Sequence, residues 1–329
     1  MSLQVAQIGE GALIAALGEI FGRVQNPKNQ KNLLFGIGDD GAVLAPSELA
    51  TVATMDLAVE GVHFRTDWST PHQIGAKVAV ANIADIYAMG GDPHSLLVGI
   101  SLTGKEEVDW VLDLARGIAE EAMKVGAQVI GGDTVRGEKI TIAITALGNT
   151  SEPIYRSGAK VGDHLVISGL PGASAAGLAL LEAGKRELFP EIVKVHLQPS
   201  VNGKNAHALI SAGAKAMCDL SDGLLVDANR ISEASGIGIR INLDNLDLSS
   251  LIEVGKSLAI DPISWVLTSG EEHLFIATLP PSAALPEGVL RIGEVVQGSG
   301  VELIGDFADA RTTTGNTLIS SNVWNHFEK

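Results

Sequence analysis

The sequence predicts an α/β (α+β) protein with two domains. The chain has 329 residues, more than the roughly 250–300 at which a single hydrophobic core stops growing. Apolar residues make up 46% of the chain and charged residues 19%, a balance typical of a globular protein with a sizeable core. In both halves, short apolar runs that end in Gly/Asp turns are followed by longer helical patterns. These three observations predict two mixed domains of ordinary size.

The first domain, residues 1–149, reads as strands and helices separated by turns. Residues 10–22 have a helical pattern, and the run NLLFGIGDDGAVL places a Gly/Asp turn between two short strands. A long Ala-rich helix is expected over 71–89, because Gly90–Gly91 provides the glycine that commonly follows a helix. The other elements expected here are strands at 51–55, 96–102, 128–130 and 140–147 and a helix at 106–125.

A change of pattern at Tyr155–Gly158 and a turn at Gly162–Asp163 place the domain boundary near residue 150. The second domain therefore covers 150–329. It restarts the strand, turn and helix order with HLVISGLPGASAAGLALLEAG, and no short-period repeat appears in either half. The further elements expected are helices at about 203–213 and 222–235 and strands at about 237–243, 274–279 and 289–295.

Charge and cysteine content exclude several classes of protein. A formal net charge of −16 would repel a nucleic-acid backbone or an anionic membrane, so neither is an expected partner. The only cysteine, Cys218, cannot form an intrachain disulfide, which favours a cytoplasmic location. The N-terminal run has no basic segment and contains Glu10 and Glu19, so it is interpreted as an amphipathic helix and not as a signal peptide.

Missing motifs narrow the chemistry further. The sequence contains no GxxxxGK[ST] phosphate-binding loop and no protein-kinase HRD or DFG motif. It has no GxSxG nucleophile motif, and its eight histidines show neither HxxxH nor HExxH spacing. A single cysteine cannot build a thiolate metal site. Many aspartates and few histidines therefore favour magnesium over zinc.

The segment Gly36–Gly41 matches the GxGxxG pattern of dinucleotide-binding folds, but its chemistry argues against that function. Adjacent carboxylates at Asp39 and Asp40 would repel a pyrophosphate, and Pro46 leaves no room for a helix of useful length. Two adjacent aspartates in a Gly turn suit a hard cation held by oxygen atoms. An ordinary surface turn is the alternative.

Further aspartates occur at expected strand ends and inside a helix. Asp56 is expected to end the strand at 51–55, and Asp133 to lie in the turn after 128–130. Each alone is typical of a turn former or helix cap, but together they favour cation binding. Asp85 lies in an otherwise apolar helix, where a buried carboxylate needs a partner. That partner is either Lys77, two helical turns earlier, or a metal ion.

The second domain contains two more acidic segments. In CDLSDGLLVDANRI, four polar residues surround a glycine at the start of a helix, and capping accounts for one or two of them. The others suggest cation ligands. These four residues are Asp219, Ser221, Asp222 and Asp227. The segment Ser269–His273 is another acidic turn before a strand, and its separate signal is weak.

Six motifs in the same order resemble the thiamine-phosphate kinase family over nearly the whole chain. They are GIGDDGAV, TMDLAVEGVHF, VAVANIADIYAMGGDP, VIGGDTVRG, RSGAKVGD and DLSDGLLVD. This family belongs to the superfamily of aminoimidazole ribonucleotide synthetase. The resemblance implies two α/β domains with the aminoimidazole ribonucleotide synthetase-like fold and a homodimer that pairs through the N-terminal sheets. It assigns ATP and Mg²⁺ binding and dimerisation to the first domain.

The resemblance also implies roles for individual residues. The implied magnesium ligands are Asp40, Thr54, Met55, Asp56, Asp85, Asp133, Asp219 and Asp222. The implied ATP contacts are Gly132, Arg156 and Ser221, and the implied substrate contacts are His63, Glu271 and Trp324. Three segments depart from the family pattern: Met55 replaces a Ser or Thr, SGEEHLF replaces GGEDYEL, and WNHF replaces YDHF.

The implied reaction transfers the γ-phosphoryl group of ATP to thiamine phosphate, with several Mg²⁺ ions and no general base. The acceptor is a phosphate, which is mostly ionised at neutral pH because its second pKa is about 6. The alternatives are another ATP-using enzyme of the superfamily, such as aminoimidazole ribonucleotide synthetase, and a non-catalytic nucleotide- or Mg²⁺-binding protein. Two superfamily members that need a terminal cysteine are disfavoured, because Cys218 is internal.

Overall fold

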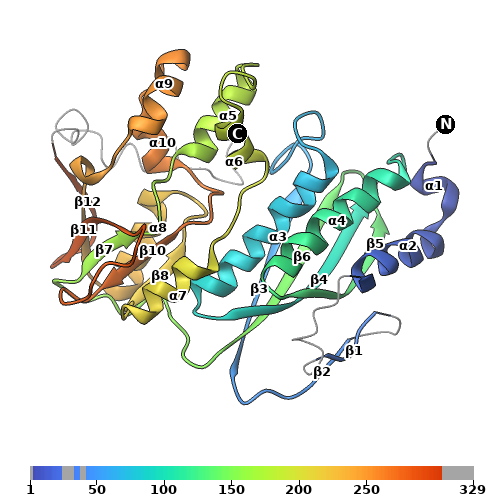
Figure 1. Ribbon diagram of the computed structural model, residues 1–329, viewed down its shortest axis with the longest axis horizontal. Helices are drawn as coiled ribbons and strands as arrows, with labels where there is room; N and C mark the ends of the chain where they lie inside the picture. The colour runs from blue at the N-terminus through green and yellow to red at the C-terminus, as the bar shows by residue number, and fades with distance from the viewer. Residues whose placement is uncertain (1–2, 24–32, 38–41, 306–329) are drawn as a thin grey trace. The chain divides into compact units, whose positions relative to one another are not determined.

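The structure is a computed structural model that describes residues 3–23, 33–37 and 42–305 (Figure 1). By its internal contacts the chain divides into two compact units. The N-terminal unit consists of Met1–Tyr87 and Gly91–Pro153, and the C-terminal unit of Ala88–Gly90 and Ile154–Lys329. The chain is mixed α/β, as the sequence predicts. In the described ranges, no helix has both the length and the apolar character needed to cross a membrane.

The N-terminal unit is built on a four-stranded sheet with the strand order β3-β6-β4-β5. β6 pairs antiparallel with β3 and β4, and β4 pairs parallel with β5. Alternate residues of β6, including Ile142 and Ile144, are completely buried, as expected for a strand with one covered face. The strands are β3 (Ala50–Val59), β4 (Asp92–Leu102), β5 (Gln128–Arg136) and β6 (Thr141–Thr150).

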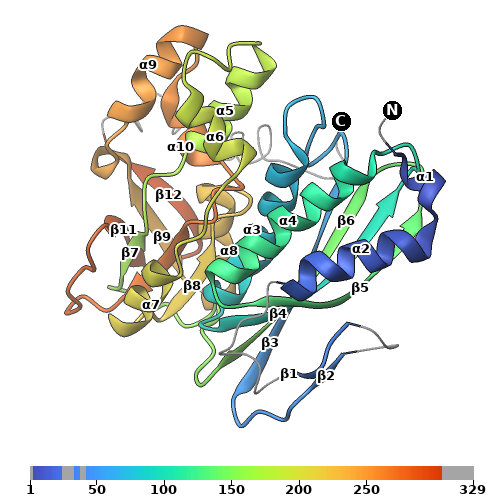
Figure 2. The ribbon, with the colours of Figure 1, turned by 45° about the vertical axis from the view of Figure 1, so that its right-hand side comes forward.

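Helices α3 (Pro71–Ala88) and α4 (Val108–Lys124) lie over one face of this sheet (Figure 2). They approach closely through glycines: a Cβ on Gly75 would lie 2.1 Å from the Leu114 carbonyl oxygen, and one on Gly117 would lie 2.1 Å from that of His72. The unit also contains α1 (Val5–Ile8), α2 (Glu10–Arg23) and an antiparallel pair, β1 (Leu33–Phe35) and β2 (Val43–Leu44). The predicted helices at 10–22, 71–89 and 106–125 are confirmed to within two residues.

Two predicted strand ends are strand interiors. β3 continues past Asp56 to Val59, because Leu57–Val59 pair with residues 141–143 of β6. β5 likewise continues through Gly131–Asp133, which pair with residues 97–99 of β4. Sheet pairing has overridden the low strand propensity of the glycines. The prediction that Asp56 ends a strand and Asp133 lies in a turn is therefore wrong.

The C-terminal unit has a six-stranded sheet with the order β12-β9-β11-β7-β10-β8. All neighbouring pairs are antiparallel except β12 and β9. β8 is fully buried at the edge, and it ends at Asp219. The strands are β7 (His164–Ile167), β8 (Ala216–Asp219), β9 (Gly238–Asn242), β10 (Phe275–Leu279), β11 (Leu290–Val296) and β12 (Gly300–Ile304).

The helices of this unit begin with recognisable signals. Asn202 caps α7 and Asp261 caps α10, each accepting a backbone N–H two residues later. The helices are α5 (Ala173–Glu182), α6 (Pro190–Leu197), α7 (Gly203–Ser211), α8 (Leu224–Ser235), the short 3₁₀ helix η1 (Leu243–Asn245), α9 (Ser249–Leu258) and α10 (Pro262–Thr268). The predictions at about 203–213 and 222–235 are confirmed, whereas α6, α9, α10, β8 and β12 were not predicted.

Candidate functional site

In the N-terminal unit, β3 and α3 bring three of the predicted ligand residues together. Thr54 and Asp56 are two residues apart, so both point to the helix-covered face of β3. The Thr54 hydroxyl donates a 2.6 Å hydrogen bond to Asp85 Oδ2 on α3. The Asp56 backbone N–H donates to Asn82 Oδ1 at 3.1 Å, and Asn82 is itself fixed by donating to the Val78 carbonyl. This group of oxygen donors forms because one strand face meets one helix face.

Met55 points the other way. It lies between Thr54 and Asp56 on β3, so its side chain projects from the opposite face of the sheet, where it is 56% exposed. The side chain is therefore not grouped with the ligands that the sequence places beside it. A contact from Met55 to a metal on the helix-covered side would have to come from its backbone carbonyl.

Asp133 and Gly132 lie on β5, at the other edge of the same sheet. The register aligns Asp133 with Gly99, Gly99 with Ala143, and Ala143 with Leu57 of β3. Two strands separate β5 from β3, which corresponds to about 14 Å between their backbones. Asp133 is exposed, and its Oδ1 accepts the N–H of Thr134 at 2.8 Å. It is therefore not part of the group formed by Thr54, Asp56 and Asp85.

Gly132 is a position where only glycine fits. A Cβ there would lie 2.0 Å from the Val98 carbonyl oxygen of β4. His63, predicted to contact the substrate, lies in the turn after β3, where its Nδ1 accepts the Val59 N–H at 3.1 Å. The remaining ring nitrogen, Nε2, then carries the proton of the neutral ring.

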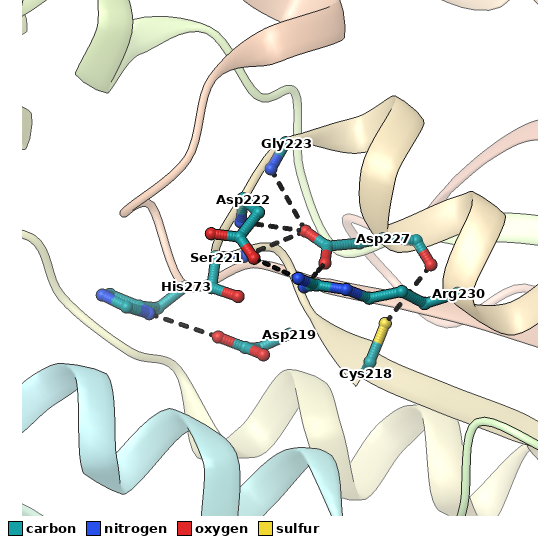
Figure 3. Close-up of polar contacts among 8 residues, drawn as sticks. All are labelled: Cys218, Asp219, Ser221, Asp222, Gly223, Asp227, Arg230 and His273. Carbon is teal, nitrogen blue, oxygen red and sulfur yellow. Dashed lines mark hydrogen bonds and ion pairs between the residues drawn. The ribbon is translucent and has the colours of Figure 1, made fainter. Parts of the chain in front are cut away.

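In the C-terminal unit, the residues predicted from DLSDG lie at the end of β8 and in the loop that leads to α8 (Figure 3). Asp219 is 2% exposed, and its Oδ2 lies 3.5 Å from His273 Nδ1. The backbone N–H groups of Ser221, Asp222 and Gly223 all donate to Asp227 Oδ2. The loop that presents Ser221 and Asp222 is thus held by a buried carboxylate of α8.

Arg230 completes this cluster. Its Nη1 donates to Asp227 Oδ1 at 2.7 Å, and its Nη2 donates to Asp222 Oδ2 in a second ion pair. Burial alone would lower the pKa of Arg230, but the two carboxylates raise it. Burial, reinforced by the negative charge of Asp219, raises the pKa of Asp227 to about 6. Sequence reasoning missed Arg230, whose only signal is its spacing of three residues from Asp227 on α8.

The acidic turn Ser269–His273 packs directly against that loop. The Glu271 N–H donates to the Ser221 carbonyl at 3.1 Å, and a Cβ on Gly270 would lie 2.1 Å from the same oxygen. Glu271 and His273 both have positive φ, 60° and 53°, a strained conformation for residues with side chains. Ser221, predicted to contact ATP, is therefore adjacent to Glu271, which is predicted to contact the substrate.

Glu272 anchors the turn from inside. Its Oε1 accepts hydrogen bonds from the N–H groups of Gly172 and Ser174 at 2.7 and 2.9 Å and from the Ser269 hydroxyl at 2.7 Å. Glu271 instead points toward His196, with Oε2 3.8 Å from Nδ1. The two glutamates of SGEEH, which the sequence could not tell apart, therefore have different surroundings: Glu272 is buried and hydrogen-bonded, whereas Glu271 faces His196.

Three other predicted residues are placed less fully. Arg156 is exposed, its carbonyl accepts the Ser235 hydroxyl at 3.0 Å, and its guanidinium interacts with the Cys218 thiol. Asp40 and Trp324 lie outside the described residues.

The donor set suits a hard cation that arrives with phosphate. Within residues 3–23, 33–37 and 42–305, no three His, Cys, Asp or Glu side chains converge on a point that could hold a metal ion. Mg²⁺ commonly takes one or two carboxylates from the protein and completes its shell with phosphate and water oxygens. Asp56 and Asp85 in the N-terminal unit would supply such carboxylates to a bound Mg²⁺. Asp219 and Asp222 would do so in the C-terminal unit.

Comparison with known proteins identifies the family. AIR synthase related protein, N-terminal domain, matches residues 38–150, and AIR synthase related protein, C-terminal domain, matches residues 160–306. A thiamine-monophosphate kinase of Mycobacterium tuberculosis is 37% identical over 296 residues, which cover 89% of this chain and 86% of the relative. That of Escherichia coli (strain K12) is 34% identical over 281 residues, 83% of each chain. This chain belongs to the thiamine-monophosphate kinase family.

Solved structures agree with the family assignment. Thiamine monophosphate kinase from Aquifex aeolicus superposes with a TM-score of 0.74 at 32% identity, covering 79% of this chain and 90% of that one. A structure described as AaThiL complexed with AMPPCP and TMP gives a TM-score of 0.75 at 30% identity, covering 92% and 96%. A hydrogenase maturation protein of Escherichia coli, at 21% identity and a TM-score of 0.69, shares the fold alone.

Proposed function

We propose that this chain transfers the γ-phosphoryl group of ATP to thiamine monophosphate, forming thiamine diphosphate and ADP. The observation that carries the proposal is the match to kinases of that substrate over most of the chain, at up to 37% identity. The similarity to a structure holding AMPPCP, an ATP analogue, and TMP, read as thiamine monophosphate, supports both substrates. We also propose that the enzyme is cytoplasmic.

The site residues follow the same proposal. Thr54, Asp56 and Asp85 and the other residues predicted as metal ligands hold Mg²⁺, and Gly132, Arg156 and Ser221 contact ATP. Arg156 suits this role because a guanidinium can pair with two phosphate oxygens. His63, Glu271 and Trp324 contact thiamine monophosphate. We assign ATP and Mg²⁺ binding and dimerisation to residues 1–149, with 150–329 as the second α/β domain.

The chemistry needs positioning more than proton transfer. The acceptor phosphate is mostly ionised at pH 7, so the chain does not have to supply a general base. The barrier lies in bringing two polyanions into line, and Mg²⁺ held by the predicted ligands would supply the positive charge that offsets their repulsion. Two groups of residues would orient the complexes of Mg²⁺ with phosphate. They are the half-buried oxygen donors of β3 and α3 and the hydrogen-bonded loop after β8.

We further propose a homodimer that pairs through the four-stranded sheet. The sheet face opposite α3 and α4 carries exposed apolar side chains in the described residues, which supports a second copy as its cover. They include Met55 at 56%, Leu57 at 52% and Val135 at 52% exposed.

A coupled assay of ADP release tests the proposed reaction. Purified protein is given Mg·ATP with thiamine, thiamine monophosphate or formylglycinamidine ribonucleotide in turn. We expect ADP release only with thiamine monophosphate, together with stoichiometric thiamine diphosphate, and no turnover when Mg²⁺ is chelated. Release with the ribonucleotide instead would identify an aminoimidazole ribonucleotide synthetase, and no release with any acceptor would indicate a binding protein. Asp56→Ala and Asp133→Ala are expected to abolish turnover while leaving the fold intact.

A further inference from the structure

The loop that presents Ser221 and Asp222 is held by one side chain of α8. Asp227 Oδ2 accepts the backbone N–H groups of Ser221, Asp222 and Gly223 at 3.1, 3.1 and 3.2 Å. Asp227 is completely buried, so water does not compete for these hydrogen bonds. Because three successive N–H groups converge on one oxygen atom, the backbone of the loop cannot turn without breaking them.

Arg230 extends this arrangement from the backbone to a side chain. Its guanidinium bonds Asp227 through Nη1 and Asp222 through Nη2 (Figure 3). Asp227 and Arg230 are three residues apart and share one face of α8, which keeps both on a rigid support. A guanidinium holds its donors in a fixed plane. The position of Asp227 therefore determines the direction in which the Asp222 carboxylate points.

If Asp227 and Arg230 only stabilised the start of α8, the contact from Arg230 to Asp222 would not be needed. Gly223, at the N-cap of α8, has no side chain that could cap the helix, and the hydrogen bonds from the loop to Asp227 do not require a second contact to Asp222. The contact from Arg230 to Asp222 does nothing for the helix. It orders a half-buried carboxylate on the loop, and it does so with a cation that itself depends on the buried Asp227.

We propose that Asp227 and Arg230 are positioning residues of the phosphoryl-transfer site, which orient Ser221 and Asp222 for the ATP phosphates and Mg²⁺. The proposal rests on the proposed function, since it takes Ser221 and Asp222 as parts of that site. Asp227 and Arg230 act only through these two residues. They belong to the nucleotide and metal side of the reaction, so the affinity for thiamine monophosphate does not depend on them.

Arg230→Lys is the decisive variant. Lysine keeps a positive charge beside the buried Asp227, so the unit can still fold, but a single ammonium cannot bridge two carboxylates in the same plane. Calorimetric titration with Mg²⁺ and AMPPCP is expected to show about 10- to 100-fold weaker binding, the loss usual when a partner of a metal ligand is removed. The KM for thiamine monophosphate should stay within about twofold of the parent value.

The matched control is Arg240→Lys. Arg240 also bridges two carboxylates, those of Glu294 and Glu302, but on the strands β9, β11 and β12 and away from the loop. The same chemical change there should leave Mg·AMPPCP binding and turnover at parent values. Equal losses in both lysine variants would show a general effect of disturbing ion pairs and would overturn the proposal.

A double-mutant cycle with Asp222→Asn separates positioning from stability. If Arg230 acts through Asp222, the double variant binds Mg·AMPPCP no more weakly than Asp222→Asn alone, whereas independent roles give additive losses. Additive losses, parent-like binding by Arg230→Lys, or an Arg230→Lys protein that does not fold would each overturn the proposal. Failure of the proposed function is recognised separately, because the parent protein would then bind Mg·AMPPCP without phosphorylating thiamine monophosphate.

Discussion

The Thr54 hydroxyl lies 2.6 Å from Asp85 Oδ2, and this hydrogen bond joins two of the predicted metal ligands across the edge strand β3 and α3. We expect Thr54→Val to cost about 1 kcal/mol of unfolding free energy, the usual net value of one hydrogen bond. Its turnover with thiamine monophosphate should fall much further, by about 10- to 100-fold, because Asp85 loses its orientation. Steady-state kinetics and chemical denaturation measure the two effects.

Thr51→Val provides the control for that substitution, because Thr51 is an exposed residue of the same strand. Thr54→Ser, which retains the hydroxyl, should recover most of the turnover. Parent-like kinetics in Thr54→Val would remove Thr54 from the site.

Gly270→Ala tests the contact between the acidic turn and the loop after β8. The new Cβ would lie 2.1 Å from the Ser221 carbonyl oxygen, so one of the two segments must move. We expect a loss of about 1–3 kcal/mol in unfolding free energy, with a lower kcat because Ser221 is displaced. Gly11→Ala, at an exposed position of α2 where the added Cβ would meet no atom beyond its own helix backbone within 4 Å, should instead be neutral or stabilise by up to about 1 kcal/mol. Equal thermal midpoints for the two variants would contradict the described packing.

Glu272 gives a pH dependence of known sign. Burial raises the pKa of its carboxyl above the ordinary value of 4.5, although the hydrogen bonds from Ser269 and from backbone N–H groups act against this. Between the ordinary and the raised pKa, the folded protein holds a proton that the unfolded chain has lost, so this carboxyl makes stability fall as pH rises. Glu272→Gln removes that contribution.

The unfolding midpoint of Glu272→Gln minus that of the parent should therefore increase as the pH rises from the ordinary carboxyl pKa of 4.5 through the raised pKa of the folded protein. Glu253→Gln, at an exposed position of α9, controls for the loss of one carboxylate. A difference that stays flat or decreases with pH would show that the carboxyl is more acidic in the folded state than proposed.

The Cys218 thiol should be unreactive toward thiol reagents in the folded protein. It is 3% exposed on β8, and its burial, together with the nearby charges of Asp227 and Asp219, raises the pKa of the thiol well above its ordinary value. Because the thiolate is the reactive form, Ellman's reagent should modify native protein far more slowly than protein unfolded in guanidinium chloride. The chain has a single cysteine, so the unfolded sample provides the one-equivalent endpoint. Rapid native modification would mean that the edge strand opens readily.

Leu57→Glu tests the proposed dimer. Leu57 is 52% exposed on the sheet face opposite the helices, and burying a carboxylate in an apolar interface is unfavourable. Light scattering after size exclusion should show a dimeric parent and a monomeric variant. Leu188→Glu introduces the same charge at a leucine that is 57% exposed in the C-terminal unit, and it should remain dimeric. A monomeric parent would make the proposed dimer wrong.

Periodicity predicted elements well where a segment is long and its pattern is strong. The helix over 71–89 was placed to within one residue, because eighteen residues of Ala-rich pattern end at a glycine pair. Asp56 and Asp133 were misplaced for the opposite reason. Glycines and aspartates usually end strands, but here neighbouring strands supply the hydrogen bonds that extend β3 and β5 through them.

The sequence by itself determined three things about this protein. Its many aspartates, without the His or Cys spacing of a zinc site, favour Mg²⁺; six motifs resemble one kinase family; and its pattern predicts two mixed domains. Residue type and order are enough for such conclusions, because ligand preference and family resemblance are properties of the chain. Only the tertiary structure decided which residues meet. Asp133 is separated from Asp56 by two strands, while Arg230 lies between Asp222 and Asp227. Strand register and the contact of a helix with a loop depend on pairings between distant segments, and no local pattern encodes them.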